Sequence, residues 1–258
     1  ALSAAGEVSA QDFEKEAGIL LSVRHPNVLQ FLGIYRGPRG PELVTEFMQL
    51  GSLLDVLRRE NEILFYNTRL SVCADLAAGI AYLHHRQICH RDIAARNVLV
   101  KQERDGLIAK IGDFGHARLM NDRGLYVPPA GVEEMLAFKW CAPEIFVQRV
   151  FSRPSDVFAI GVTFWEVFNN GEEPRSRMGV GAVRSAVLGG ECLPYSGLLN
   201  RDLYDDIIVP CLLTDPSSRP TATDLHELLA ARLVHPDEPS FTDSHVSSIV
   251  MSGDKSDG

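Results

Sequence analysis

The chain has 258 residues, of which 45% are hydrophobic, so it is long enough to bury a large core in one or two domains. Its formal net charge of −9 gives it none of the basic surface that nucleic-acid binding requires. Five scattered cysteines without a Cys-x-x-Cys pair argue against a disulfide framework or a zinc site and favour a reducing compartment. The longest apolar stretch, residues 157–168, is too short to span a membrane.

The first fifty residues predict one helix and two strands. Residues 11–24 have an apolar face with helical spacing, and Pro26 requires the helix to end nearby. Residues 28–35 and 43–48 are strand-like runs, and the glycines and prolines of residues 37–41 predict a turn between them.

Two helices are expected next. Ser52 is a suitable cap for a short amphipathic helix over residues 53–59. Residues 68–85 are mostly apolar and rich in alanine, which predicts a longer and largely buried helix.

Three polar side chains then follow within six positions. Asp92, Arg96 and Asn97 provide a carboxylate, a guanidinium group and an amide just before an apolar run at residues 98–100. Asp92 lies five residues before Asn97, on a loop where it is able to accept a proton from an incoming hydroxyl group.

A hairpin is expected between Asn97 and Asp113. The turn sequence Asp105-Gly106 lies between them and has strand-forming residues on both sides. Such a hairpin brings Asn97 and Asp113 to the same end. Their amide and carboxylate oxygens suit Mg²⁺, which favours one or two carboxylates together with substrate phosphates.

The second half of the chain predicts a long loop and then helices. Residues 116–139 show no sustained periodicity and are broken by glycines and prolines, which is typical of a functional or mobile loop. Residues 155–168 are hydrophobic almost all round, which indicates a central core helix. Further helices are expected at residues 179–188, 203–213 and 223–233. Residues 234–258 are rich in Ser, Asp, Gly and Pro and predict a disordered tail.

The two central polar clusters resemble the signature set of protein kinases. His90-Arg91-Asp92 with Asn97 resembles the catalytic loop, and Asp113-Phe114-Gly115 resembles the DFG motif. The resemblance implies a bilobal α+β fold. Residues 1–47 would be the remainder of a β-rich N-lobe and residues 48–233 a mainly helical C-lobe.

Later motifs extend the resemblance through most of the chain. Residues 142–144 resemble the APE motif, and Asp156 with Gly161 resembles the start of the central C-lobe helix. Arg219 resembles the late arginine that pairs with the APE glutamate. The resemblance therefore implies a structural role for Asp156 and a buried ion pair between Glu144 and Arg219.

Two features are typical of tyrosine kinases in particular. Asp92 is followed by Ile-Ala-Ala-Arg-Asn, with Ala94 where serine/threonine kinases usually carry lysine, and Lys139-Trp140 precedes the APE motif. The resemblance implies transfer of the ATP γ-phosphoryl group to tyrosine hydroxyls of protein substrates. Asp92 would accept the proton, and Arg96 would orient both Asp92 and the phenol. Asn97 and Asp113 would hold Mg²⁺.

The resemblance also assigns residues outside the catalytic loop. Thr45 corresponds to a gatekeeper, with the Glu46 carbonyl and the Met48 amide facing adenine and Leu99 beneath the base. Glu16 resembles the helix glutamate that pairs with a strand lysine. Tyr126 is a candidate activation-loop phosphosite, although a tyrosine in a polar loop is often simply exposed.

That strand lysine and a glycine-rich loop are missing from the 258 residues. Lys15 is adjacent to Glu16 on the same predicted helix and is not a substitute. We therefore expect a fragment of a kinase that itself transfers little or no phosphate, in preference to a pseudokinase that acts as a scaffold. A serine/threonine or dual-specificity kinase is the other alternative. We expect a cytoplasmic location or the cytoplasmic part of a membrane receptor; the oligomeric state is not predicted.

Overall fold

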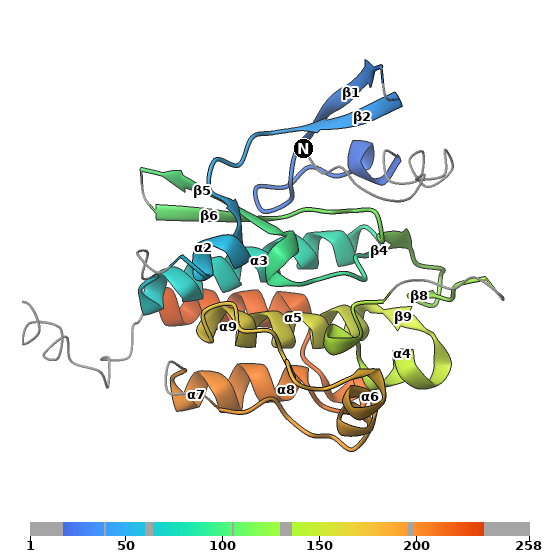
Figure 1. Ribbon diagram of the computed structural model, residues 1–258, viewed down its shortest axis with the longest axis vertical. Helices are drawn as coiled ribbons and strands as arrows, with labels where there is room; N and C mark the ends of the chain where they lie inside the picture. The colour runs from blue at the N-terminus through green and yellow to red at the C-terminus, as the bar shows by residue number, and fades with distance from the viewer. Residues whose placement is uncertain are drawn as a thin grey trace, which may run out of the picture.

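The computed structural model describes residues 18–38, 40–59, 64–104, 106–129, 136–195 and 199–234. Figure 1 shows a small strand-rich part above a larger helical part. This arrangement confirms the α+β class. The predicted boundary between the two lobes, at residues 47 and 48, falls in the segment that connects the small part to the larger part. This boundary stays a prediction. No helix in the described ranges is both long and apolar enough to cross a bilayer.

The small part contains the antiparallel strands β1 (Phe31–Gly37) and β2 (Gly40–Thr45). Gly37 pairs with Gly40, although both were expected to belong to a five-residue turn. The strand β1 therefore ends two residues later than predicted, and β2 begins three residues earlier. Of the helix predicted over residues 11–24, the described part is helical at residues 18–22; Glu16 lies outside the described residues.

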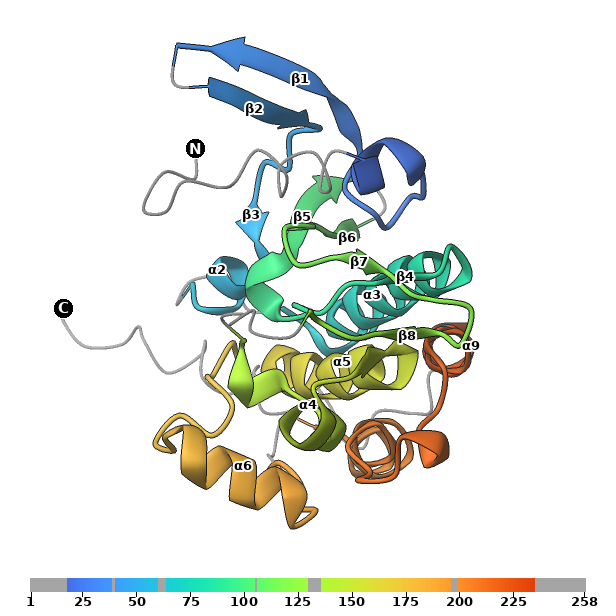
Figure 2. The ribbon, with the colours of Figure 1, turned by 90° about the vertical axis from the view of Figure 1, so that its right-hand side faces the viewer.

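A three-stranded sheet lies between the strand pair and the helices (Figure 2). Its order is β3 (Gly51–Ser52), β5 (Val98–Glu103) and β6 (Gly106–Ile111). Val98 pairs with Ile111 and Glu103 with Gly106, which confirms the hairpin predicted from Asp105-Gly106.

Ser52 accepts a 3.1 Å hydrogen bond from the Asp55 amide and so caps α2 (Leu53–Leu57), as predicted. The helix ends two residues earlier than expected. Near the catalytic motifs, β4 (Ile88–Cys89) pairs with β7 (Arg118–Leu119).

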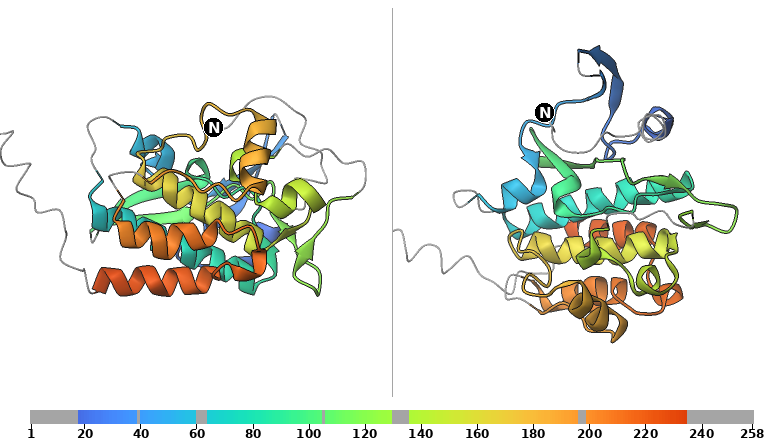
Figure 3. Two further views of the ribbon diagram at one scale, coloured as in Figure 1. Left: turned by 90° about the horizontal axis from the view of Figure 1, so that it is seen from below. Right: turned by 45° about the vertical axis from the view of Figure 1, so that its right-hand side comes forward.

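Three long helices form the core of the larger part. The helix α3 (Tyr66–His85) packs against both α5 (Arg153–Phe168) and α9 (Ala222–Val234), and the three run side by side (Figure 3). Every residue of α5 from Ser155 to Phe168 is buried, because its apolar side chains have neighbours all round. Ser152 and Ser155 form a capping box at its start.

The remaining elements are short. The residues predicted as one long loop contain β7, β8 (Leu125–Tyr126) and the 3₁₀ turn η2 (Phe138–Trp140). They are followed by α4 (Pro143–Gln148), β9 (Phe151–Ser152) and α6 (Val180–Leu188). The helix α9 includes Val234, the first residue of the predicted disordered tail, and the rest of that tail, residues 235–258, lies outside the described residues.

The helix predicted at residues 203–213 is wrong as a single regular element. It is divided into α7 (Arg201–Leu203), a π-helical turn η3 (Tyr204–Ile208) and α8 (Val209–Cys211). Pro210 has no amide hydrogen for the carbonyl four residues earlier, which disfavours regular α-helical bonding here. The 3₁₀ turn η4 (Pro216–Ser218) then leads to α9.

Gly161 allows α5 to lie close to α8. A Cβ atom at Gly161 would lie 2.5 Å from the Cβ of Cys211, which is a backbone-proximal atom that cannot swing away. We expect Gly161→Ala to lower the free energy of unfolding by about 1–3 kcal/mol in a urea titration. The control is Gly181→Ala in α6, where nothing lies within 4 Å of an added Cβ. Equal stability of the two variants would contradict the close approach.

Candidate active site

The buried carboxylate of Asp156 positions the loop that carries Asp92. Its oxygens accept hydrogen bonds from the backbone amides of His90, at 2.8 Å, and Arg91, at 2.9 Å. His84 Nε2 lies 2.9 Å from the same carboxylate. Burial acts to raise the pKa of Asp156, but the hydrogen bonds from His84 and the two amides hold this pKa below its usual value. Arg91 has a φ of +71°, an uncommon conformation that these contacts help to stabilise.

Asp92, Arg96 and Asn97 meet at one point. The Arg96 guanidinium group donates to Asp92 Oδ1. Asn97 Nδ2 donates to Asp92 Oδ2 at 2.6 Å and to the Asp92 carbonyl oxygen at 2.7 Å. Both amide hydrogens of Asn97 are thus used, and its side-chain oxygen is the atom left for a cation. The turn η1 (Ala95–Asn97) produces this convergence.

The hairpin brings Asp113 to the same end of the sheet. The Gly112 amide donates to the Asn97 carbonyl at 2.8 Å, one step beyond the pairing of Val98 with Ile111. Asp113 follows with its side chain exposed, whereas Phe114 is buried with its ring 5.3 Å from the His90 ring. Burial lowers the pKa of His90, which favours its neutral, structural form.

The oxygens of Asn97 and Asp113 suit Mg²⁺, which takes few protein ligands and keeps waters or phosphates in its remaining positions. In the described part of the chain there is no group of three or more His, Cys, Asp or Glu side chains that would form a protein-only metal site. The donor set fits a cation held jointly with a phosphate ligand.

A second segment lies against this cluster. The Arg96 guanidinium carbon lies 4.8 Å from the centre of the Trp140 ring. The indole NH of Trp140 donates to Glu166 at 2.8 Å, and Lys139 forms a 3.0 Å ion pair with Glu173. The Lys139-Trp140 pair is therefore fixed next to the candidate catalytic loop.

Comparisons with known proteins agree with this geometry. Residues 2–229 match the family described as protein tyrosine and serine/threonine kinase. The chain belongs to this kinase family. The α+β fold with a strand-rich N-terminal part and a helical C-terminal part is that expected for such a domain.

Tyrosine kinases are among the proteins to which the chain is similar. The chain is 38% identical over 222 residues to the epidermal growth factor receptor of Apis mellifera, across 86% of this chain and 17% of the relative. It is 35% identical over 224 residues to mouse tyrosine-protein kinase TXK (87% and 41%) and 35% identical over 227 residues to Drosophila melanogaster tyrosine-protein kinase Btk (87% and 28%). The chain thus spans less than half of each relative's length, and the resemblance to tyrosine kinases is confirmed.

The residues predicted to face adenine lie on two sheets: Thr45, Glu46 and Met48 at or just after β2, and Leu99 on β5. Thr45 ends β2, Met48 is buried, and Leu99 is half-buried on β5. The Glu46 carboxylate accepts from Lys110 Nζ at 2.6 Å and from the Gln30 amide at 2.9 Å. The Glu46 side chain is thus bonded to other residues of the protein, and the contact of its backbone carbonyl with adenine stays a prediction.

Tyr126 lies in β8 against the arginine of the catalytic loop. The Arg91 guanidinium carbon is 4.6 Å from the centre of the Tyr126 ring and 4.1 Å from that of Phe151. The two rings lie on the paired strands β8 and β9. The structure therefore places the candidate phosphosite next to Arg91, and its modification stays a prediction.

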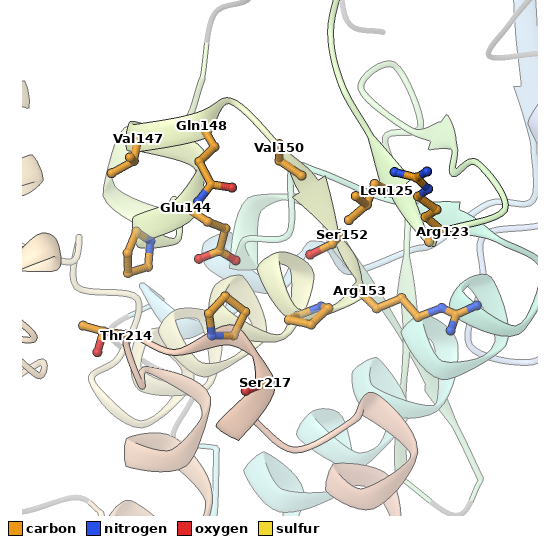
Figure 4. A pocket seen from close by; sticks show the side chains of 14 residues that line it. Arg123, Leu125, Glu144, Val147, Gln148, Val150, Ser152, Arg153, Thr214 and Ser217 are labelled. Carbon is orange, nitrogen blue, oxygen red and sulfur yellow. The ribbon is translucent and has the colours of Figure 1, made fainter.

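The predicted ion pair between Glu144 and Arg219 is confirmed. Two guanidinium nitrogens of Arg219 donate to the two Glu144 oxygens at 2.8 and 2.9 Å; the Arg219 side chain is fully buried, and 9% of the Glu144 side chain is exposed. Glu144 also lines a cavity of about 640 Å³ that has α4 on one side and Arg123 and Arg153 on the other (Figure 4). None of the candidate catalytic residues lines this cavity, so it is separate from the site of the chemistry.

Sequence reasoning missed two charged residues. Glu166 is the one charged residue in the apolar stretch 157–168, and that exception was a usable signal. Lys110 lies three residues before Asp113 of the DFG motif, but its pairing with Glu46 depends on a contact between distant segments, which no local pattern reveals.

Replacement of Asp156 tests its effect on the catalytic loop. Asp156→Asn places an NH₂ group among three donors, so we expect a loss of about 3–5 kcal/mol in the free energy of unfolding at pH 7. Because the folded pKa of Asp156 is depressed, its contribution is present above about pH 4, the usual unfolded value, and is lost as the pH falls through the folded value. Urea titrations at pH 7 and pH 3 should therefore show a smaller difference at pH 3. Asp202→Asn, at an exposed carboxylate, is the control.

Proposed function

We propose that this chain is the catalytic part of a protein tyrosine kinase, which transfers the γ-phosphoryl group of ATP to tyrosine hydroxyls of protein substrates. The observation that supports this most strongly is the convergence of Arg96 and Asn97 on the Asp92 carboxylate, next to Asp113. Phosphoryl transfer depends mainly on positioning and charge stabilisation, and this cluster provides groups for both.

The residues take separate roles in this proposal. Asp92 accepts the proton of the tyrosine hydroxyl as the oxygen attacks the γ-phosphorus, and Arg96 keeps the carboxylate oriented towards the acceptor. Asn97 and Asp113 hold Mg²⁺ through their side-chain oxygens. When bound, Mg²⁺ neutralises charge on the β- and γ-phosphate oxygens.

ATP would bind between the strand pair and the sheet. We propose that Thr45, the Glu46 carbonyl, the Met48 amide and Leu99 surround the adenine. Glu16 would pair with a strand lysine that these 258 residues do not contain. We further propose that phosphorylation of Tyr126 adds a charge that pairs with Arg91 and orders the activation segment.

Two alternatives are kept. A pseudokinase that binds partners without catalysis would apply if the longest natural chain that contains these residues also lacked the strand lysine. The second alternative is a serine/threonine or dual-specificity kinase, because the matched family includes serine/threonine kinases. Against it, Ala94 and Lys139-Trp140 are typical of tyrosine kinases. We propose the cytoplasm, or the cytoplasmic side of a receptor, as the location, because ATP and the protein substrates of tyrosine kinases are found there.

Asp92→Asn tests the catalytic assignment. In the longest natural chain that contains these residues, we expect turnover to fall by at least about 100-fold, because the amide cannot accept the proton. Nucleotide affinity, measured by isothermal titration calorimetry, should change little. Asp202→Asn is the matched control. Unaltered turnover in Asp92→Asn would refute the role of Asp92, and absence of turnover in the unmodified chain would favour the pseudokinase.

The acceptor class is a separate question. A mixed library of tyrosine, serine and threonine peptides should yield phosphotyrosine alone, because the Lys139-Trp140 segment beside Arg96 accommodates an aromatic acceptor. Phosphoamino-acid analysis of the products measures this directly. Recovery of phosphoserine or phosphothreonine in comparable amounts would favour the serine/threonine or dual-specificity alternative.

A further inference from the structure

Glu166 connects the two segments that flank the candidate acceptor site. It lies near the end of α5 with only 2% of its surface exposed. One oxygen, Oε2, accepts the Trp140 indole NH at 2.8 Å and the Ala95 backbone NH at 3.1 Å. Ala95 belongs to the turn of the catalytic loop, and Trp140 ends the turn before α4. A single carboxylate oxygen thus fixes both segments.

These contacts extend to the candidate base. The Trp140 ring lies under the Arg96 guanidinium group, with 4.8 Å between the guanidinium carbon and the ring centre. Arg96 in turn donates to Asp92. A change in the orientation of the indole would therefore alter the surface on which Arg96 rests, and a shift of Ala95 would move the residue directly before Arg96.

The surroundings of Glu166 allow its charge to change near neutral pH. Burial raises the pKa of Glu166 to about 7, although the two NH donors and the positive charges of Arg96 and Arg58 act in the opposite direction. In the described part of the chain, these two arginines are the charged groups whose fields act on Glu166; Arg96 comes from η1, and Arg58 is the residue that caps the end of α2. Hydrogen bonds to a carboxylate are about twice as strong as those to a neutral acceptor, so protonation weakens both contacts.

We propose that Glu166 is a proton-sensitive positioning residue of the phosphotransfer site. Its ionised form holds Trp140 and the catalytic loop so that Arg96 stays on Asp92, and its neutral form loosens both. The catalytic consequence rests on the proposed kinase function. The conformational consequence does not, and a spectroscopic test on this chain reports it without any turnover.

The chain contains two tryptophans, which makes fluorescence a direct readout. Trp165 donates its indole NH to the Pro194 carbonyl at 2.7 Å, whereas the indole NH of Trp140 donates to Glu166, so Trp165 serves as a background signal. We expect tryptophan emission of the chain to show a transition with a midpoint near pH 7 between pH 5 and pH 9. Glu166→Gln and Trp140→Phe should each remove that transition.

Thr163→Val is the matched control, because Thr163 is a buried polar residue of the same helix whose hydroxyl donates to the Ala159 carbonyl at 2.8 Å. This variant should keep the transition. Circular dichroism confirms that each variant is folded before it is compared, and Trp140→Phe tests the same contact from its other side if Glu166→Gln does not fold. A transition that persists in Glu166→Gln or in Trp140→Phe, or its absence from the unmodified chain, would overturn the proposal.

The kinetic test uses the longest natural chain that contains these residues. Loss of a charge-assisted hydrogen bond corresponds to about a ten-fold fall in kcat for Glu166→Gln at pH 8, with the KM for ATP unchanged. The decline of kcat of the unmodified enzyme between pH 8 and pH 6 should be smaller in this variant. If kcat and its pH profile match those of the unmodified enzyme while the fluorescence transition is lost, Glu166 has no positioning role in catalysis and the proposal fails. If the unmodified chain shows no turnover, the proposed function fails and the fluorescence result still decides the conformational half.

Discussion

The helix α5 holds the catalytic loop from inside the protein through two buried carboxylates. Asp156, in its first turn, accepts the amides of His90 and Arg91, and Glu166, near its last turn, accepts the amide of Ala95. A buried carboxylate is costly unless its oxygens receive donors, so each of these groups favours one loop conformation strongly over others. That conformation includes the left-handed Arg91, after which the chain presents Asp92 to Arg96 and Asn97. The geometry of the site therefore depends on the two buried carboxylates of α5.

The β5–β6 hairpin supplies the second requirement, which is the meeting of Asn97 and Asp113. Its register is set by the tight turn before Gly106 and continues to the hydrogen bond between Gly112 and Asn97. The same hairpin connects the two parts of the molecule, because Lys110 of β6 pairs with Glu46 after β2. A two-stranded sheet such as β1–β2 has little stability by itself, so contacts of this kind matter for its placement.

Local sequence patterns were sufficient to predict the elements whose structure depends on interactions between residues that are close in the chain. The cap at Ser52, the hairpin around Gly106 and the buried helix α5 follow from hydrogen bonding by a small polar side chain, from turn geometry and from continuous apolar character. The predicted ends of helices and strands were less accurate where several local backbone conformations are compatible with the same residues. The turn between β1 and β2 is tighter than its five turn-forming residues suggested, and Pro210 lies in a helical region that adopts π geometry around η3.

The sequence by itself determined the family, through the resemblance of its motifs to those of protein kinases, and the identity of the chemical groups, because Asp92, Asn97 and Asp113 are read directly from it. The tertiary structure alone decided which distant groups support them. Glu166 accepts a hydrogen bond from the Trp140 indole NH, and Lys110 forms an ion pair with Glu46. Both contacts join segments that are far apart in the chain. Such contacts depend on how helices and strands pack, and a buried charge gains its role and its pKa from that packing.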